Sequence, residues 1–100
     1  MITSKQRSYL KGLAHHLDPL VFIGWQGVTE NVVNEMDQCL ENHELVKVKL
    51  QESAELDPKE VANELKDELG AEFVQALGRK FTLYRQSHDP EKRKIVLPRK

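Results

Sequence analysis

The stretch Leu20–Gly27, LVFIGWQG, is an apolar run that stops at a Gly-x-x-Gly turn just before an expected helix. A buried strand that leads through glycines into a helix N-terminus gathers backbone N–H groups at an exposed edge, and that geometry suits a phosphate. The alternative is an ordinary turn that needs glycine for a positive φ angle. Both interpretations predict a short strand over Leu20–Ile23, covered on both faces, and a following helix capped by Thr29.

Upstream of this stretch, capping and spacing predict a helix. Thr3 followed by Gln6 is a capping-box pattern, so the helix should begin there and run to about Leu17. Asp18-Pro19 ends it. The apolar stripe that should bury this helix consists of Tyr9, Leu10, Leu13, Ala14 and Leu17.

Downstream, the same kinds of signal predict further helices and strands. The stretch Asp57-Pro58-Lys59-Glu60 is typical of a helix start, and Gly70 is a typical helix end. The dipeptide Gly78-Arg79 joins the last two strands into an antiparallel hairpin. After the helix capped by Thr29, the expected elements are a strand over Leu45–Leu50, the helix that ends at Gly70, and strands over Ala71–Leu77 and Lys80–Gln86.

The order α-β-α-β-α-β-β predicts an α/β fold of the two-layer α+β kind. A β-α-β unit needs parallel strands and the final hairpin adds an antiparallel pair, so we expect a mixed four-stranded sheet packed with helices. The 100 residues fit one domain over residues 1–100, with a basic extended tail from about residue 87. Within that tail, Ile95–Leu97 either packs back onto the domain or adds a short strand.

Composition narrows the class of protein. With 39% hydrophobic and 31% charged residues, the chain resembles a charge-rich globular domain rather than a disordered one. No apolar run reaches the roughly 20 residues of a membrane helix, and the start MITSKQRSYLK lacks the apolar core of a signal peptide. The single Cys39 cannot form an internal disulfide, and no metal-type spacing surrounds it. We therefore expect a cytoplasmic protein with no metal, no cofactor and no membrane contact.

The net charge of −1 conceals a strong asymmetry along the chain. Residues 29–78 carry four basic and thirteen acidic side chains, whereas residues 79–100 carry eight basic side chains against two acidic ones. Residues 1–28 add Lys5, Arg7 and Lys11 against Asp18. Because local potential steers binding, a polyanionic partner is compatible with this total. We expect the acidic middle to face away from a nucleic acid and both basic ends to lie near it.

Several spaced motifs carry a resemblance to a known family over nearly the whole chain, from Thr3 to about Arg99. They are TSKQRSYLKGLAHHLDPLVFIGWQGVTENVV, then HELVKVKL, LGRKFTLYR and KIVLPR. The chain resembles single-domain bacterial members of the CRM family (chloroplast RNA splicing and ribosome maturation), the YhbY-type proteins. The resemblance implies a fold similar to the C-terminal domain of translation initiation factor three. It also implies an RNA-binding Gly-x-x-Gly loop and association with precursors of the large ribosomal subunit.

The charge pattern and the turn predict a non-catalytic RNA-binding protein that takes no small-molecule substrate and is a monomer. The resemblance implies that its partner is ribosomal RNA in pre-large-subunit particles and that it assists ribosome assembly. The phosphates should lie at the amides of the turn and at cations from both ends of the chain. The predicted RNA-binding residues are Gly24, Trp25, Gln26, Gly27, Lys5, Arg7, Lys11, Arg79, Lys80 and Arg85.

Individual residues allow a second interpretation. Trp25 stands where relatives often have a small or basic residue, and it either stacks on a base or folds over the sheet edge. Lys47 and Lys49 share one face of their strand and either join the basic patch or keep the sheet soluble. The adjacent His15 and His16 point about 100° apart on a helix, which favours surface histidines over a metal site.

Two other functions are compatible with parts of the pattern. A phosphate-ligand enzyme would hold a nucleotide at Gly24–Gly27, but the turn has neither the Gly-Lys-Ser/Thr ending of a P-loop nor the three-glycine spacing of a dinucleotide-binding fold. A protein-interaction adaptor would use the acidic helices, whose carboxylates are otherwise a solvated face. Cys39 falls on an apolar stripe and is expected to be a small buried residue.

Overall fold

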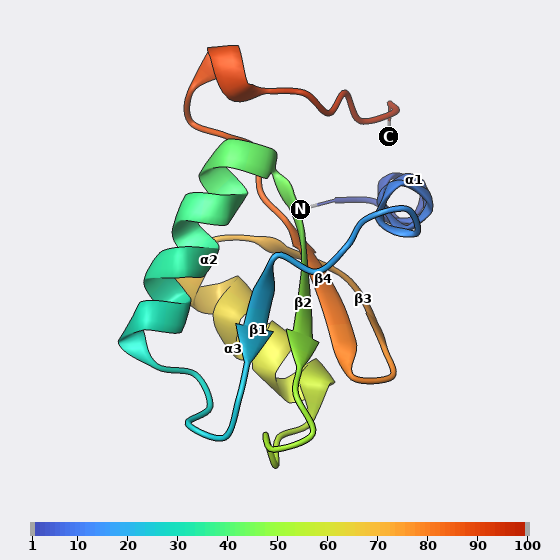
Figure 1. The fold of residues 1–100 in the computed structure, drawn as a ribbon. Coiled ribbons are helices and arrows are strands. Elements are labelled where there is room, and N and C mark those ends of the chain that lie inside the picture. Colours follow the sequence, from blue (N-terminus) through green and yellow to red (C-terminus); the bar gives the residue numbers. More distant parts are fainter. Residues whose placement is uncertain (1, 100) are drawn as a thin grey trace.

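The computed structural model describes residues 2–99, in which three helices pack against a four-stranded sheet (Figure 1). The elements are α1 (Ser4–Ala14), β1 (Val21–Ile23), α2 (Glu30–His43), β2 (Leu45–Leu50), α3 (Pro58–Leu69), β3 (Glu72–Leu77), β4 (Lys80–Tyr84) and a 3-10 turn, η1 (Pro90–Lys92). The order of elements and the mixed sheet confirm the predicted fold class.

The strands lie in the order β1-β2-β4-β3. β1 and β2 are parallel, and β4 runs antiparallel to both of its neighbours. The hairpin turns at Gly78, whose φ of 62° lies in the left-handed region. Because β4 separates β2 from β3, β3 is an edge strand, and the β3–β4 hairpin lies at one side of the sheet.

The two faces of the sheet are covered very differently. The helices α2 and α3 pack on one face and bury the main core, which includes Ile23, Leu40, Val48, Leu65 and Phe81. On the other face α1 and the tail cover one end only, around Leu10, Leu45, Val74 and Tyr84. The structure therefore has the two predicted layers and, in addition, a partial third layer made by α1 (Figure 1).

Because half of one sheet face is uncovered, the expectation that β1 is buried on both faces is wrong. Val21 and Ile23 are fully buried, but Phe22 between them points to the uncovered face and is 51% exposed. The prediction of a strand buried on both faces came from its continuous apolar run. Such a run does not indicate which face of the strand a helix covers.

Most helix ends agree with their sequence signals. Thr3 and Gln6 form the predicted capping box, Asp57 caps α3, and Gly70 ends α3 in the left-handed conformation. The first helix is shorter than predicted and ends at Ala14. Tyr9 and Leu17, expected on its buried stripe, are exposed.

Candidate nucleic-acid interface

The Gly24–Gly27 turn forms at the end of β1, as predicted. The N–H of Gly27 donates to the carbonyl oxygen of Gly24 at 2.9 Å, which closes the turn. Gly27 has a φ of 72°, a region in which a side chain is strained. Thr29 then caps α2, so the positive end of that helix dipole faces the turn.

Trp25 and Gln26 occupy the exposed tip of the turn. The Trp25 side chain is 76% exposed, so the indole is not folded over the sheet edge. Among residues 2–99, no protein acceptor is found for the backbone N–H groups of Trp25 and Gln26. Trp25 and Phe22 line the same shallow hollow of about 260 Å³. The tip thus combines two free N–H donors with two accessible aromatic rings.

Arg79, predicted to bind phosphate, uses its guanidinium to hold the loop between β2 and α3. It donates to the backbone carbonyl oxygens of Gln51 at 2.9 Å, Ala54 at 2.5 Å and Leu56 at 3.3 Å. Leu56 in turn packs beside Gly27, where an added Cβ would lie 3.4 Å from its Cδ1 atom. Arg79 therefore links the hairpin to the glycine turn, and its charge remains at the surface.

Arg85 lies away from the turn. Its side chain is 11% exposed and forms ion pairs with Asp37 at 2.8 Å and Glu41 at 3.5 Å. It also donates to the carbonyl oxygen of Leu69 at 3.1 Å. Asp37 and Glu41 lie in the second half of α2, whereas the turn precedes its first residue. The structure does not bring Arg85 to the predicted surface, because two carboxylates hold it elsewhere.

Two of the three cations predicted on α1 lie beside the edge strand. Arg7 donates from Nε to the carbonyl oxygen of Phe73 at 2.9 Å. Together with Lys11 and with Lys59 of α3, it lines a groove of about 300 Å³ along β3. Lys5 is exposed on α1 but does not line this groove.

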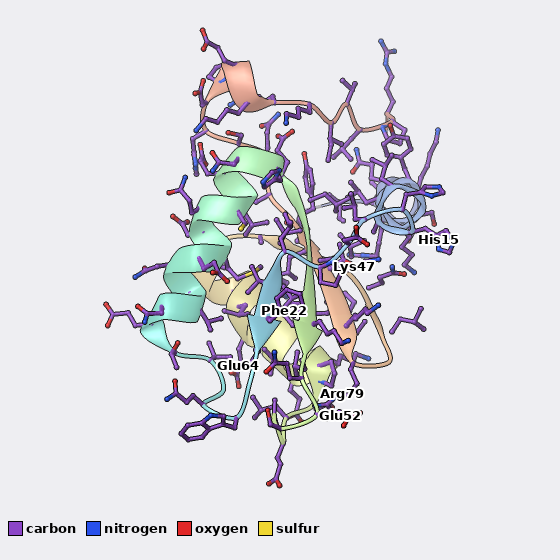
Figure 2. All side chains as sticks on the ribbon, in the orientation of Figure 1. His15, Phe22, Lys47, Glu52, Glu64 and Arg79 are labelled. Carbon is purple, nitrogen blue, oxygen red and sulfur yellow. The ribbon has the colours of Figure 1, made fainter. Side chains whose placement is uncertain are left out.

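The uncovered half of the sheet carries a cluster of lysines. Lys47 and Lys49 from β2 and Lys80 from β4 alternate with core residues and point to the same face. Lys47 and Lys80, with His15 at the C-cap of α1, line a hollow of about 400 Å³. It shares part of β3 with the groove beside α1, and among the described residues neither hollow is lined by an acidic side chain. Figure 2 shows this side of the sheet, with Phe22, Lys47 and His15 labelled.

The acidic residues of the middle of the chain lie mostly on the other side. The helices α2 and α3 carry most of them, on the face of the sheet opposite the lysines, as Glu64 illustrates (Figure 2). The exceptions are the buried Glu44, Glu72 at the start of β3, and the exposed Glu52, Glu55 and Asp57 in the loop that Arg79 holds. The turn end of the molecule therefore carries both signs of charge, whereas among the described residues the two hollows along β3 are lined by basic side chains and by no acidic one.

A buried carboxylate anchors the C-terminal tail. Glu44 ends α2 with a φ of 66° and is fully buried. Its carboxylate accepts the backbone N–H groups of Ser87 at 2.9 Å, Lys94 at 2.7 Å and Ile95 at 3.1 Å. Burial by itself raises the pKa of Glu44, but these three hydrogen bonds and the charge of Arg93 outweigh it, so the pKa is lowered.

Glu41 holds the start of the tail in the same way. It accepts from the imidazole Nδ1 of His88 at 2.8 Å and from the hydroxyl of Ser87 at 3.0 Å. The hydrogen bond with His88 is the main reason that the pKa of Glu41 falls to about 2. The tail, whose Ile95 and Leu97 pack on the smaller core, thus lies at the C-terminal end of α2. The turn lies at the other end, and a 14-residue helix is about 21 Å long. The basic tail therefore lies away from the turn, although its Lys94 lines one hollow with Lys47 of β2.

The described residues contain little that points to other chemistry. Among residues 2–99 no group of three or more His, Cys, Asp or Glu side chains could hold a metal ion, and no helix there is long and apolar enough to cross a membrane. Cys39 is half-buried, and burial, aided by the charge of Glu35, raises the pKa of its thiol. A raised pKa keeps a thiol protonated and poorly nucleophilic.

Comparison with known proteins places the chain in a family. A model of the CRS1 / YhbY (CRM) domain matches residues 2–85. The chain belongs to the CRM domain family. A Haemophilus influenzae protein named as an RNA-binding protein is 42% identical to this CRM domain over 99% of the chain and 97% of its own length. The "Probable RNA-binding protein YqeI" of Bacillus subtilis is 36% identical over 98% of the chain and its full length. A solution structure of a Staphylococcus aureus protein, described provisionally as RNA binding, superposes with a TM-score of 0.79 at 39% identity and covers 98% of this chain and all of that one.

Several features of this CRM domain were not predicted as functional. Phe22 was assigned to a covered strand, Lys59 to an ordinary helix start, and Lys47 and Lys49 were left open between two roles. The period-two alternation of β2 was a signal for its lysines, since it fixed their shared face. No sequence signal showed that α1 leaves this face half uncovered.

Proposed function

We propose that this CRM domain is a non-catalytic RNA-binding protein whose interface is the lysine-bearing open half of the sheet, bordered by the Gly24–Gly27 turn and by Arg7 and Lys11. The observation that carries the proposal is the gathering of cations from α1, β2 and β4 around two hollows that share residues of β3 and, among the described residues, have no acidic lining. Such a field attracts a polyanion and holds its phosphates without reading sequence. The RNA-binding names of the relatives support the same class of partner.

We propose further that the RNA is ribosomal RNA in precursors of the large subunit, and that the protein acts in their assembly as a cytoplasmic monomer. This step rests on the resemblance to YhbY-type proteins. A surface that binds phosphates and reads shape suits a folded ribosomal RNA better than a single short sequence.

A salt titration tests the RNA interface. If about five phosphates are engaged, log affinity should fall against log salt with a slope of roughly −3.5 to −4.5. Replacing Lys47 and Lys80 together by Ala should weaken binding to any RNA and make the slope shallower by about 1.5. Lys66 and Lys92, which lie away from the open face, provide a matched double variant that should bind like the wild type. Equal slopes for both double variants would remove the open face from the interface.

Co-sedimentation with ribosomal particles tests the biological partner. Association that ribonuclease abolishes supports contact with RNA in the particle. Association that persists after digestion points instead to a protein partner and to an adaptor that uses the acidic helices. Tight binding of a mononucleotide, without binding to RNA, would favour the nucleotide enzyme and overturn the proposal.

A further inference from the structure

A row of four side chains crosses the open half of the sheet from the glycine turn to the hairpin. In register, Phe22 of β1 lies beside Lys49 of β2, Lys49 faces Lys80 of β4, and Lys80 faces Leu77 of β3. All four are exposed, Phe22 by 51% and Leu77 by 75%. Neighbouring strands are about 4.8 Å apart, so the row spans roughly 14 Å.

The two lysines in this row oppose each other without compensation. Lys49 and Lys80 are direct partners in an antiparallel pair, where like charges are destabilising. Among residues 2–99, neither has a carboxylate within ion-pair distance. A phosphate bound between the two ammonium groups would remove this repulsion, so the pair is complementary to a single strand of negative charge.

Aromatic rings flank the lysines on the side of the turn. Phe22 and Trp25 line one hollow of about 260 Å³, which opens at the start of the row. The Trp25 ring is more exposed than any other large apolar side chain of the described residues except Val96. Base stacking on exposed aromatic rings beside a basic track is the usual mode of single-strand binding. Bases paired within a helix are stacked on one another and cannot make these contacts.

We propose that this row is a binding track for single-stranded RNA, with unpaired bases stacked on Phe22 and Trp25 and the backbone phosphates held by Lys49 and Lys80. The proposal rests on the proposed RNA-binding function and deepens it, since it names unpaired nucleotides as the ligand. The lysine pair provides affinity, and the two rings provide the preference for a single strand over a duplex.

Trp25 is the only tryptophan in the chain, so its fluorescence reports directly on the track. We would titrate the protein with a short oligouridylate and, separately, with the same RNA annealed to oligoadenylate. Stacking should quench the indole fluorescence with the single strand and leave it nearly unchanged with the duplex. Replacement of Phe22 by Ala should weaken single-strand binding roughly five- to a hundredfold.

Three variants keep this test independent of folding. Val96→Ala removes an exposed apolar side chain of the tail, away from the row, and should bind the single strand within twofold of the wild type. Phe22→Tyr keeps a ring and should restore binding, whereas Phe22→Leu keeps apolar bulk and should not. Unfolding curves of the four variants identify any that lose structure. If Phe22→Ala is unfolded, the comparison of Phe22→Tyr with Phe22→Leu still shows whether an aromatic ring is needed for single-strand binding.

The outcomes separate this proposal from the broader one. Salt-dependent RNA binding that is unaffected by Phe22→Leu and Trp25→Ala, or equal quenching by single strand and duplex, would overturn the track and leave RNA binding in place. Binding of neither RNA would overturn both proposals. Loss of single-strand binding in Phe22→Leu, with recovery in Phe22→Tyr, supports the track.

Discussion

The two ends of the sheet treat charge in opposite ways. At the C-terminal end of α2, Arg85 pairs with Asp37 and Glu41, and the imidazole of His88 shares the Glu41 carboxylate. At the turn end, Lys49 and Lys80 face each other and lack any carboxylate partner among the described residues. Both regions contain basic residues. The structure neutralises their charge at the C-terminal end of α2 and leaves it unpaired at the turn end.

This difference separates a structural use of charge from a binding use. Carboxylates that accept backbone N–H groups fix the tail on the domain, and they consume nearby positive charge in doing so. Lysines that repel each other reduce the stability of the fold, and their interaction becomes favourable only when an anion binds between them. We therefore use the partners of each cation, rather than the number of cations in a segment, to locate the interface.

The largest expected effect is at the neutralised end. Replacement of Glu44 by Gln should lower the free energy of unfolding by about 2 kcal/mol, because an amide NH₂ would face backbone N–H groups that now donate to a carboxylate oxygen. Urea unfolding measures this, with Glu64→Gln on the outer side of α3 as control. RNA affinity should stay within twofold of the wild type. A large loss of RNA affinity in the folded variant would break the division between the two ends.

Acid should weaken the attachment of the tail to the domain. The pKa values of Glu41, about 2, and of Glu44 both lie below the ordinary 4.5 in the folded protein. Stability from these groups is therefore complete above about pH 4.5 and is lost as the pH falls towards about 2. Unfolding measured at successive pH values should show this decline, and Glu44→Gln should show a shallower one. Identical pH profiles would mean that the tail is not held by the ionised carboxylate.

At the uncompensated end, stability and binding should move in opposite directions. Replacement of Lys49 by Thr removes the repulsion with Lys80 and supplies a residue that favours strands, so stability should rise by about 0.5 kcal/mol. The same change should weaken RNA binding about three- to fivefold, the loss expected for one phosphate contact. Thermal unfolding and a salt titration on one preparation measure both. A variant that loses stability would show that Lys49 is supported by contacts within the fold.

The fold was largely predictable because each element has a local signal. The capping box at Thr3, the Pro after Asp57 and the glycine at 70 act within a few residues, so they are visible in sequence. The site was predictable in part, for the same reason: the Gly24–Gly27 turn is local. Which cations lie beside that turn depends on how α1 and the tail pack.

Long-range hydrogen bonds explain what the sequence could not predict. Arg79 donates to carbonyl groups more than 20 residues away, and Glu44 accepts from N–H groups more than 40 residues away. Glu44 was read as part of an acidic segment, although it ends α2 at a positive φ of 66°, where glycine is usual. Its buried carboxylate explains why the tail, counted as a basic binding element, lies at the far end of α2.

The smallest expected effect uses the same substitution at both ends. Glu52 lies in the loop that Arg79 holds through the carbonyl oxygens of Gln51 and Ala54, whereas Glu91 is exposed in the tail. Replacement of Glu52 by Gln should strengthen RNA binding about twofold at low salt, since one repelled carboxylate is removed. Glu91→Gln has the same change in net charge but lies in η1, at the C-terminal end of α2 and away from the turn (Figure 1), so screening by salt should leave no measurable effect. Equal effects of the two variants would mean that net charge, rather than the local arrangement of cations, governs binding, and the contrast between the two ends would then lose its functional meaning.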